Sequence, residues 1–260
     1  MQLTSPKNPF LQSVRRAAND GRPTESGLVV AEGPHLTEEA VRSTSKWIVE
    51  RILTTTAGRE RHAELLRRAK AEIIEISAQA FRSVSETGSN QEILALLRPP
   101  QWSRADAMDS DGPVVVLDGI QDPGNAGTIV RSAEAFCAGG VVFLEGSARV
   151  ANGKLLRATA GSIFRVPFLE EISRTDLVAE TRRRNLPLYA LTPRGELTVT
   201  QADFRRHCVL AVGSEGGGIS SEVLANARTV AVPVAKVESL NAAVACSIAL
   251  FEAARQRRKA

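Results

Sequence analysis

Five short apolar runs in the second half of the chain constrain its fold more than any other feature. They lie at residues 114–117, 141–144, 188–191, 209–212 and 230–232, with helix-like stretches at 128–137, 177–185 and 222–227 between them. Polar residues do not alternate with apolar ones along these runs, so both faces of each strand are expected to be buried. Buried strands separated by helices are typical of a parallel sheet covered by helices on both sides. The sequence therefore predicts an α/β fold, closed by a long helix over residues 241–257.

A polar segment divides the chain into two predicted domains. Residues 101–110 lack hydrophobic periodicity and lie between a Pro-Pro pair and a Gly-Pro pair, as expected of a linker. We therefore expect a smaller domain over residues 1–106 and a larger one over residues 112–260. The smaller domain is predicted to be α/β, with helices at 14–18, 34–42 and 59–71 and strands at 28–31, 47–49, 52–53 and 73–76.

Composition narrows the classes of protein that this chain can belong to. The formal net charge of +4 favours polyanionic partners only mildly. Aromatic residues make up 4% of the chain, so base stacking is not expected to dominate any binding of nucleic acid. No apolar run approaches the roughly 18 residues that a membrane span needs, so we expect a cytoplasmic protein without a membrane partner.

Cysteine and histidine usage predicts neither disulfides nor a metal site. Cys137, Cys208 and Cys246 are odd in number, far apart and embedded in apolar runs, so we interpret them as reduced core residues. The three histidines are isolated, and no His, Cys or carboxylate spacing is typical of a metal-binding site. We therefore expect no metal.

Three short stretches place polar side chains and bare backbone beside strand-like runs. They are Asn125-Ala-Gly-Thr-Ile-Val-Arg131, Gly213-Ser-Glu-Gly-Gly-Gly218 and Val237-Glu-Ser-Leu-Asn241. Open α/β sheets bind ligands at the carboxyl ends of their parallel strands. The three stretches are therefore candidates for one ligand site.

Each stretch also has a purely structural interpretation. Asp122 or Asn125 can cap the helix that follows, and Ser239 or Asn241 can cap the last helix. The glycine-rich stretch can be a flexible loop, and it lacks both the lysine of a P-loop and the glycine spacing of a Rossmann fold. Taken singly, the three stretches leave these alternatives open.

Taken together, the three stretches resemble the motifs of the SpoU/TrmH branch of the SPOUT methyltransferases. Asn125-x-Gly127-x-x-x-Arg131 resembles the first motif, Gly213-x-Glu215-Gly216 the second and Ser239-Leu240-Asn241 the third. The segment over residues 157–164 resembles the one that this family carries between the first two motifs. The resemblance spans about residues 113–255.

The first half resembles the N-terminal RNA-binding extension of the same family, which has a ribosomal-protein-like α/β fold. Asn8-Pro9, Val30-Ala-Glu-Gly33 and Glu38-Glu-Ala40 carry this resemblance. The sequence departs from it at Glu92, where relatives usually have glycine, and in the loop over residues 233–237, which is one residue shorter than usual.

The resemblance implies a fold and an activity that periodicity would not reveal. It implies a trefoil knot near the C-terminus, where hydrophobic patterning alone predicts an ordinary doubly wound sheet. It also implies methyl transfer from S-adenosylmethionine to a ribose 2′-hydroxyl of RNA, in a homodimer with a shared active site. Ribosomal RNA is favoured over transfer RNA, because the N-terminal extension is similar to that of ribosomal enzymes.

The resemblance also points to the residues that carry the chemistry, and in this family the residue that matches Arg131 is often assigned as the base; guanidinium chemistry favours another role for it. We expect Arg131 to clamp a substrate phosphate and to stabilise charge at the 2′-oxygen, because a guanidinium rarely gives up its proton. Glu215 is expected to orient Arg131 or to accept the proton, while Asn125, Ser239 and Asn241 position the ribose or these partners. The cofactor is expected to contact the backbone of Thr192, Gly213, Val232 and Leu240.

Two other classes of function compete with this hypothesis. One is a non-catalytic RNA-binding or ribosome-associated protein that uses the first half of the chain. The other is a nucleotide-dependent enzyme that binds phosphate at the glycine-rich loop. Retention of Arg131, Glu215, Ser239 and Asn241 together counts against an inert second half.

Overall fold

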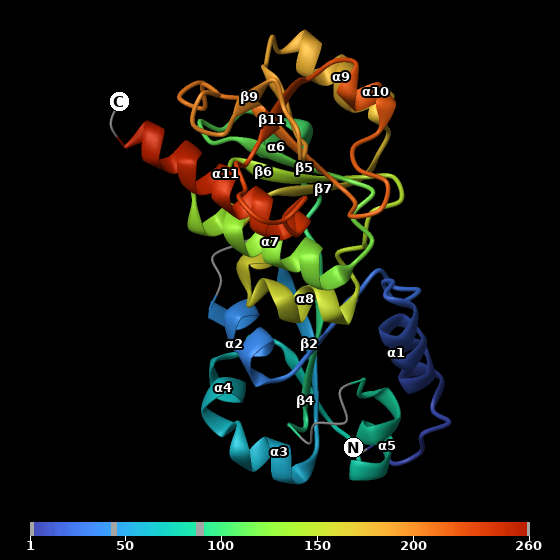
Figure 1. Cartoon of the computed structure of the whole chain (residues 1–260). Helices are drawn as coiled ribbons and strands as arrows, with labels where there is room; N and C mark the ends of the chain where they lie inside the picture. Colours follow the sequence, from blue (N-terminus) through green and yellow to red (C-terminus); the bar gives the residue numbers. More distant parts are fainter. Residues whose placement is uncertain (1–2, 43–45, 87–90, 259–260) are drawn as a thin grey trace. The chain divides into compact units, whose positions relative to one another are not determined.

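The computed structural model describes residues 3–42, 46–86 and 91–258, which form two compact units (Figure 1). The first unit comprises Met1–Gln101 and Arg149–Arg165, and the second comprises Trp102–Ala148 and Val166–Ala260. The sequence-based division at residues 106–112 places the segment 149–165 in the later domain. In the structure this segment packs with the N-terminal residues.

Among its described residues, the first unit is built on a four-stranded sheet in the order β1-β4-β2-β3. Strand β4 pairs antiparallel with β1 and β2, whereas β2 and β3 are parallel. The strands are β1 (Val29–Glu32), β2 (Ile48–Thr54), β3 (Glu72–Glu75) and β4 (Ile93–Arg98). The helices are α1 (Pro9–Asp20), α2 (Pro34–Arg42), α3 (Thr56–Arg61), α4 (Ala63–Arg68), α5 (Ala78–Val84), α8 (Gly153–Thr159) and the 3₁₀ helix η1 (Ser162–Phe164).

The segment Arg149–Arg165 is joined to the rest of the first unit by packing, a hydrogen bond and ion pairs. Trp47 is buried; its ring packs edge-on against Phe164, and its Nε1 donates to the Ile163 carbonyl at 3.2 Å. Arg157 pairs with Glu86 at 3.0 Å, and Arg165 pairs with Glu39 at 2.6 Å. These contacts complete the core of the unit with residues from much later in the sequence.

Most predicted elements of the first unit are present, although the strands expected at 47–49 and 52–53 form the single strand β2, and helix α5 was not predicted. The helix predicted over residues 59–71 is divided at His62 into α3 and α4. The fully paired strand β4 was not predicted, because its Leu and Ala residues favour helices in isolation. Just before β4, Glu92 adopts a φ of +54°, a left-handed conformation that favours glycine. This conformation is the physical reason why glycine would suit this position better than glutamate.

The second unit is built on a sheet of seven described strands, all parallel, in the order β7-β6-β5-β10-β8-β11-β9. The strands are β5 (Val114–Asp118), β6 (Gly140–Leu144), β7 (Phe168–Ile172), β8 (Leu188–Leu191), β9 (Leu197–Thr198), β10 (Val209–Gly213) and β11 (Arg228–Ala231). The helices are α6 (Arg104–Met108), α7 (Pro123–Ala135), α9 (Arg174–Arg183), α10 (Ser221–Leu224) and α11 (Ala242–Arg257). The predicted α/β fold with a parallel sheet is confirmed, and the trefoil knot stays a prediction.

Four strands of this sheet are buried along their whole length. Every residue of β5, β6, β8 and β10 is buried, as expected for parallel strands covered on both faces. Helices α7 and α11 lie side by side (Figure 1). A hydrogen bond of 2.7 Å between the hydroxyls of Ser132 and Ser247 and an edge-on contact of Phe136 with Phe251 join them.

The cysteines do not all lie in the core, so that prediction is wrong for one of them. Cys208 and Cys246 are buried, and burial raises the pKa of their thiols to about 11 and about 12. Cys137 is exposed, because it follows the C-cap of α7 in a left-handed turn with φ of +55°. Only the two buried thiols are therefore protected from solvent.

The described part of the chain contains no helix that is both long and apolar enough to cross a membrane. In the same residues, no group of three or more His, Cys, Asp or Glu side chains is placed to hold a metal ion.

Candidate functional site

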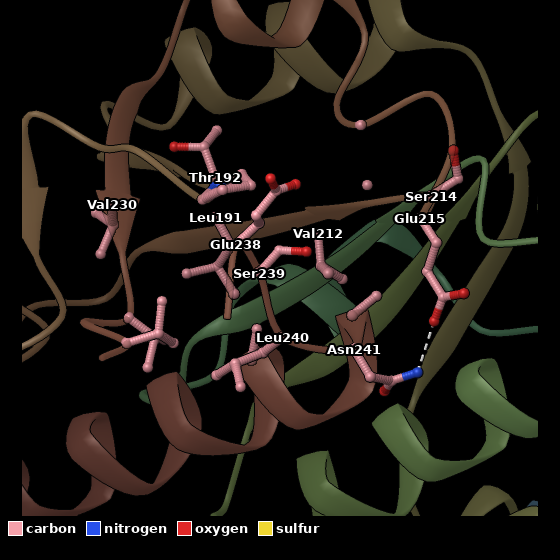
Figure 2. A pocket seen from close by; sticks show the side chains of 17 residues that line it. Leu191, Thr192, Val212, Ser214, Glu215, Val230, Glu238, Ser239, Leu240 and Asn241 are labelled. Carbon is pink, nitrogen blue, oxygen red and sulfur yellow. Dashed lines mark hydrogen bonds between the residues drawn. The ribbon is translucent and has the colours of Figure 1, made fainter. Parts of the chain in front are cut away.

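A pocket of about 440 Å³ opens where β8, β10 and β11 end, next to the start of α11 (Figure 2). All these strands run in the same direction, so their carboxyl ends meet at one edge of the sheet. The residues that line it are Leu191, Thr192, Pro193, Val212, Gly213, Ser214, Glu215, Gly218, Val230, Val232, Val234, Glu238, Ser239, Leu240, Asn241, Ala242 and Ala245. Two of the three sequence stretches thus meet at the pocket.

The glycine-rich stretch forms a tight closed loop after β10. The backbone N–H of Ser214 donates to the Gly218 carbonyl at 3.2 Å, and the Gly218 N–H donates to the Ser214 carbonyl at 2.9 Å. A Cβ on Gly213 would lie 2.2 Å from the backbone of Gly218. The loop can therefore close only over a glycine, and closure presents Glu215 beside the pocket.

Asn241 joins the last helix to this loop. Its Oδ1 accepts from the backbone N–H groups of Ala243 and Val244 at 3.0 and 3.2 Å, which caps α11. Its Nδ2 donates to Glu215 Oε1 at 2.6 Å (Figure 2) and to Asn125 Oδ1 at 3.0 Å. The Asn241 side chain thus has two roles: its oxygen caps α11, and its nitrogen holds Glu215 and Asn125.

Asn125 completes a three-residue cluster with Glu215 and Asn241. Its Nδ2 donates to Glu215 Oε1 at 3.1 Å, so one carboxylate oxygen accepts from two amides. The N-cap of α7 is Asp122, whose Oδ1 accepts from the Asn125 N–H at 2.8 Å. The side chain of Asn125 is therefore left to hold Glu215, and the second oxygen of Glu215 has no hydrogen bond with the described residues.

Arg131 and Ser239 lie outside this cluster. Arg131 is exposed on α7 and does not line the pocket, and its side chain has no hydrogen bond or ion pair with other described residues. The expected contact between Glu215 and Arg131 is thus not present, since the two amides hold Glu215 instead. Ser239 lines the pocket beside Leu240, and its side chain has no hydrogen bond with a described residue.

The four residues expected to contact the cofactor surround the same pocket. Thr192, Gly213, Val232 and Leu240 all line it, although they come from four separate segments. The Thr192 N–H is already used, since it donates to the Val230 carbonyl at 3.0 Å. Their contact with a cofactor stays a prediction.

Charge and polarity decide which ligands the pocket suits. Its charged side chains are Glu215 and the unpredicted Glu238, and none of the described residues that line it is basic. A phosphate would lack a cationic partner there, whereas a cationic sulfonium would lie in a favourable field. The apolar side chains of Leu191, Val212 and Leu240 offer the surface that an adenine ring needs. The pocket therefore fits S-adenosylmethionine better than a nucleoside triphosphate.

Sequence reasoning missed Glu238, although a signal was present. It directly precedes Ser239, so it belongs to the third stretch and enters the pocket with it. A carboxylate in the segment before a helix is normally exposed to solvent and has no further role. The sequence pattern alone therefore did not identify Glu238 as a pocket residue.

Family comparisons cover both parts of the chain. Residues 112–251 match the SpoU rRNA Methylase family, and residues 8–95 match the MRM3-like substrate binding domain. The chain is 30% identical to the 23S rRNA (guanosine(2553)-2'-O)-methyltransferase RlmP of Bacillus subtilis, over 96% of this chain and 98% of that protein. An uncharacterized tRNA/rRNA methyltransferase of Synechocystis sp. is also 30% identical, over 98% and 94% of the two chains.

Solved structures show the same architecture. The SpoU methyltransferase AviRb from Streptomyces viridochromogenes, in complex with the cofactor AdoMet, has a TM-score of 0.87 and 27% identity, over 97% of this chain and 99% of that one. An AdoMet-bound rRNA methyltransferase from Sinorhizobium meliloti has a TM-score of 0.84 and 25% identity, over 98% and 97%. These similarities span both units, and they agree with the residues gathered at the pocket. The chain belongs to the SpoU rRNA methylase family.

Proposed function

We propose that the protein transfers a methyl group from S-adenosylmethionine to a ribose 2′-hydroxyl of ribosomal RNA. The observation that carries this proposal is the cluster of Asn125, Glu215 and Asn241 at the edge of the pocket. Three separate sequence motifs meet there, and they leave one oxygen of Glu215 available to a substrate.

Cofactor binding rests on backbone and apolar side chains. Thr192, Gly213, Val232 and Leu240 would hold S-adenosylmethionine around the pocket, which is lined chiefly by small and apolar residues. When bound, the cofactor supplies a methyl group on a positively charged sulfur, which is an activated leaving group. The pocket's two carboxylates, Glu215 and Glu238, complement that positive charge.

The residues of the chain would then activate the nucleophile. A ribose hydroxyl attacks poorly until its proton is removed, so the unengaged oxygen of Glu215 is our candidate for the acceptor of that proton, directly or through water. Asn125 and Asn241 fix this carboxylate through its other oxygen. Ser239 would position the ribose. Arg131 would bind the adjacent phosphate and stabilise charge on the 2′-oxygen, with its guanidinium still protonated.

Ribosomal RNA is the proposed substrate rather than transfer RNA. RlmP, which is similar over nearly the whole chain, is a 23S rRNA methyltransferase, and the first unit matches a substrate binding domain. In that unit, Arg15 and Arg82 are exposed on the packed helices α1 and α5 and have no ion pair with described residues. Free guanidinium groups of this kind bind RNA phosphates readily.

We further propose that the protein is a homodimer. Val244 and Phe251 of α11 are 47% and 56% exposed, which is unusual for large apolar side chains on one helix. A second copy of this chain would cover them. Light scattering should therefore give the mass of two chains, and the mass of one chain would contradict the proposal.

Calorimetric titration and RNA mapping test the proposed function. We expect S-adenosylmethionine to bind the purified protein and ATP and NAD to give no heat of binding, because the pocket lacks basic residues. Deleting the gene should remove a 2′-O-methyl group from ribosomal RNA. The wild-type gene should restore it, and a Glu215→Gln variant should not. Absence of S-adenosylmethionine binding, or an unchanged RNA, would contradict the proposal.

A further inference from the structure

A buried carboxylate lies beside the site without being part of it. Asp118 is the last residue of β5 and is 2% exposed. It does not line the pocket, and it touches neither Asn125 nor Asn241 by hydrogen bond. Burying a charged group is costly unless it is paired, so its partners should explain its presence.

The two oxygens of Asp118 bind two different segments. Oδ1 accepts from Nε and Nη2 of Arg174 at 3.0 and 2.9 Å, in the first turn of α9. Oδ2 accepts from the backbone N–H of Ser220 at 2.7 Å. All three bonds are charge-assisted and therefore stronger than neutral ones. Asp118 thus links the end of β5 to α9 and to Ser220, which lies two residues after Gly218.

Ser220 is one end of the loop that carries Glu215, and Gly213 is the other. Gly213 lies opposite Asp118 in the sheet register, and Ser220 donates to the Asp118 side chain. Both ends of the loop are therefore anchored at Asp118. Between them, Gly216, Gly217 and Gly218 have no side chains that could fix the loop by packing. Buried Ile219 and the Ser214–Gly218 hydrogen bonds hold the loop between its ends, and Asp118 adds a restraint at the ends themselves.

We propose that Asp118 and Arg174 are positioning residues for Glu215. Arg174 fixes the Asp118 carboxylate through two donors, and Asp118 fixes Ser220. Fixing Ser220 keeps the loop in the position in which Asn125 and Asn241 donate to Glu215. The inference rests on the proposed function only where it concerns catalysis. The structural part, that Asp118 restrains the loop, stands independently of it.

Replacing Asp118 with asparagine tests both parts. An amide has only one acceptor oxygen. If that oxygen accepts from Ser220, the NH₂ group faces Arg174 and cannot accept from it, so either the Ser220 bond or the Arg174 bond is lost. We expect faster amide hydrogen exchange in residues 214–220 of the ligand-free protein. We also expect kcat to fall about 10- to 100-fold, as displaced catalytic groups typically cause, while the Kd for S-adenosylmethionine changes less than about threefold.

A double-mutant cycle separates positioning from general stability. If Asp118 acts through Glu215, the Asp118→Asn substitution should lower kcat no further in a Glu215→Gln background. Additive effects of the two substitutions would overturn the proposal. Arg174→Lys is the second variant, in case Asp118→Asn does not fold. It keeps the charge but loses the paired donors, so it should change exchange and kcat in the same direction by a smaller amount.

Asp176 provides the matched control. It also lies in the first turn of α9 and pairs with an arginine, Arg104, at 3.3 Å, but its side chain is 56% exposed and has no hydrogen bond or ion pair with residues 213–220. Asp176→Asn should leave exchange in residues 214–220 and kcat unchanged. Unchanged exchange in Asp118→Asn would overturn the inference. A wild-type protein that transfers no methyl group would instead contradict the proposed function, and the exchange result would still stand.

Discussion

Replacing Arg131 with alanine is expected to lower kcat for methyl transfer about 100- to 1,000-fold, the usual cost of removing one donor that stabilises developing negative charge. The temperature of unfolding and the affinity for S-adenosylmethionine should stay unchanged. The reason is structural: the Arg131 side chain is exposed, has no hydrogen bond or ion pair with another described residue and does not line the pocket. Steady-state kinetics, thermal unfolding and calorimetry measure the three quantities.

Two further variants make this result specific. Arg131→Lys keeps the charge but loses the paired N–H donors that fit a phosphate, so most of the activity should still be lost. Near-normal turnover of Arg131→Lys would show that Arg131 does not act as a clamp. Arg206, another exposed arginine of the second unit, does not line the pocket, and Arg206→Ala should behave like the wild type.

Replacing Gly213 with alanine is expected to abolish most cofactor binding. The new Cβ would lie 2.2 Å from the Gly218 carbonyl and 2.4 Å from the Ile219 nitrogen, and both are backbone atoms that cannot rotate away. The closed loop must therefore shift, at a cost of about 1–3 kcal/mol in stability. Gly213 and Gly218 line the pocket, so the Kd for S-adenosylmethionine should rise at least about tenfold.

Gly216→Ala is the control for this effect within the same loop. A Cβ on Gly216 would meet nothing within 4 Å, and Gly216 does not line the pocket. Its affinity for S-adenosylmethionine and its temperature of unfolding should match those of the wild type. Wild-type affinity in Gly213→Ala would show that the loop does not need its closed form to bind the cofactor.

The sequence predicted the centre of the second unit better than its edges. Strands β5, β6, β8 and β10 are apolar throughout because both faces are covered, so they stand out as continuous runs. The edge strand β7 reads Phe-Leu-Glu-Glu-Ile, with two glutamates on a half-exposed surface, and it was not predicted. The two-residue strand β9 is too short to carry any pattern.

Residues at the site were predictable where a local motif carried them. Asn125, Glu215, Ser239 and Asn241 each belong to a short stretch beside a strand, and three of them form the cluster that the structure shows. The contact between Asp118 and Arg174 was not predictable in this way. The chain has 29 acidic and 33 basic residues apart from histidine, and sequence spacing does not determine which of them meet across 56 positions.

The packing of Arg149–Arg165 with the N-terminal residues has a consequence for how this protein can be divided. A fragment ending at Gln101 would lack Phe164 and Ile163, and the buried ring of Trp47 would be left facing water. Glu39 and Glu86 would lose their arginine partners in the same cut. No single break in the chain therefore yields two self-sufficient halves. Separate production of the two units would therefore require residues 149–165 to be supplied to the first unit.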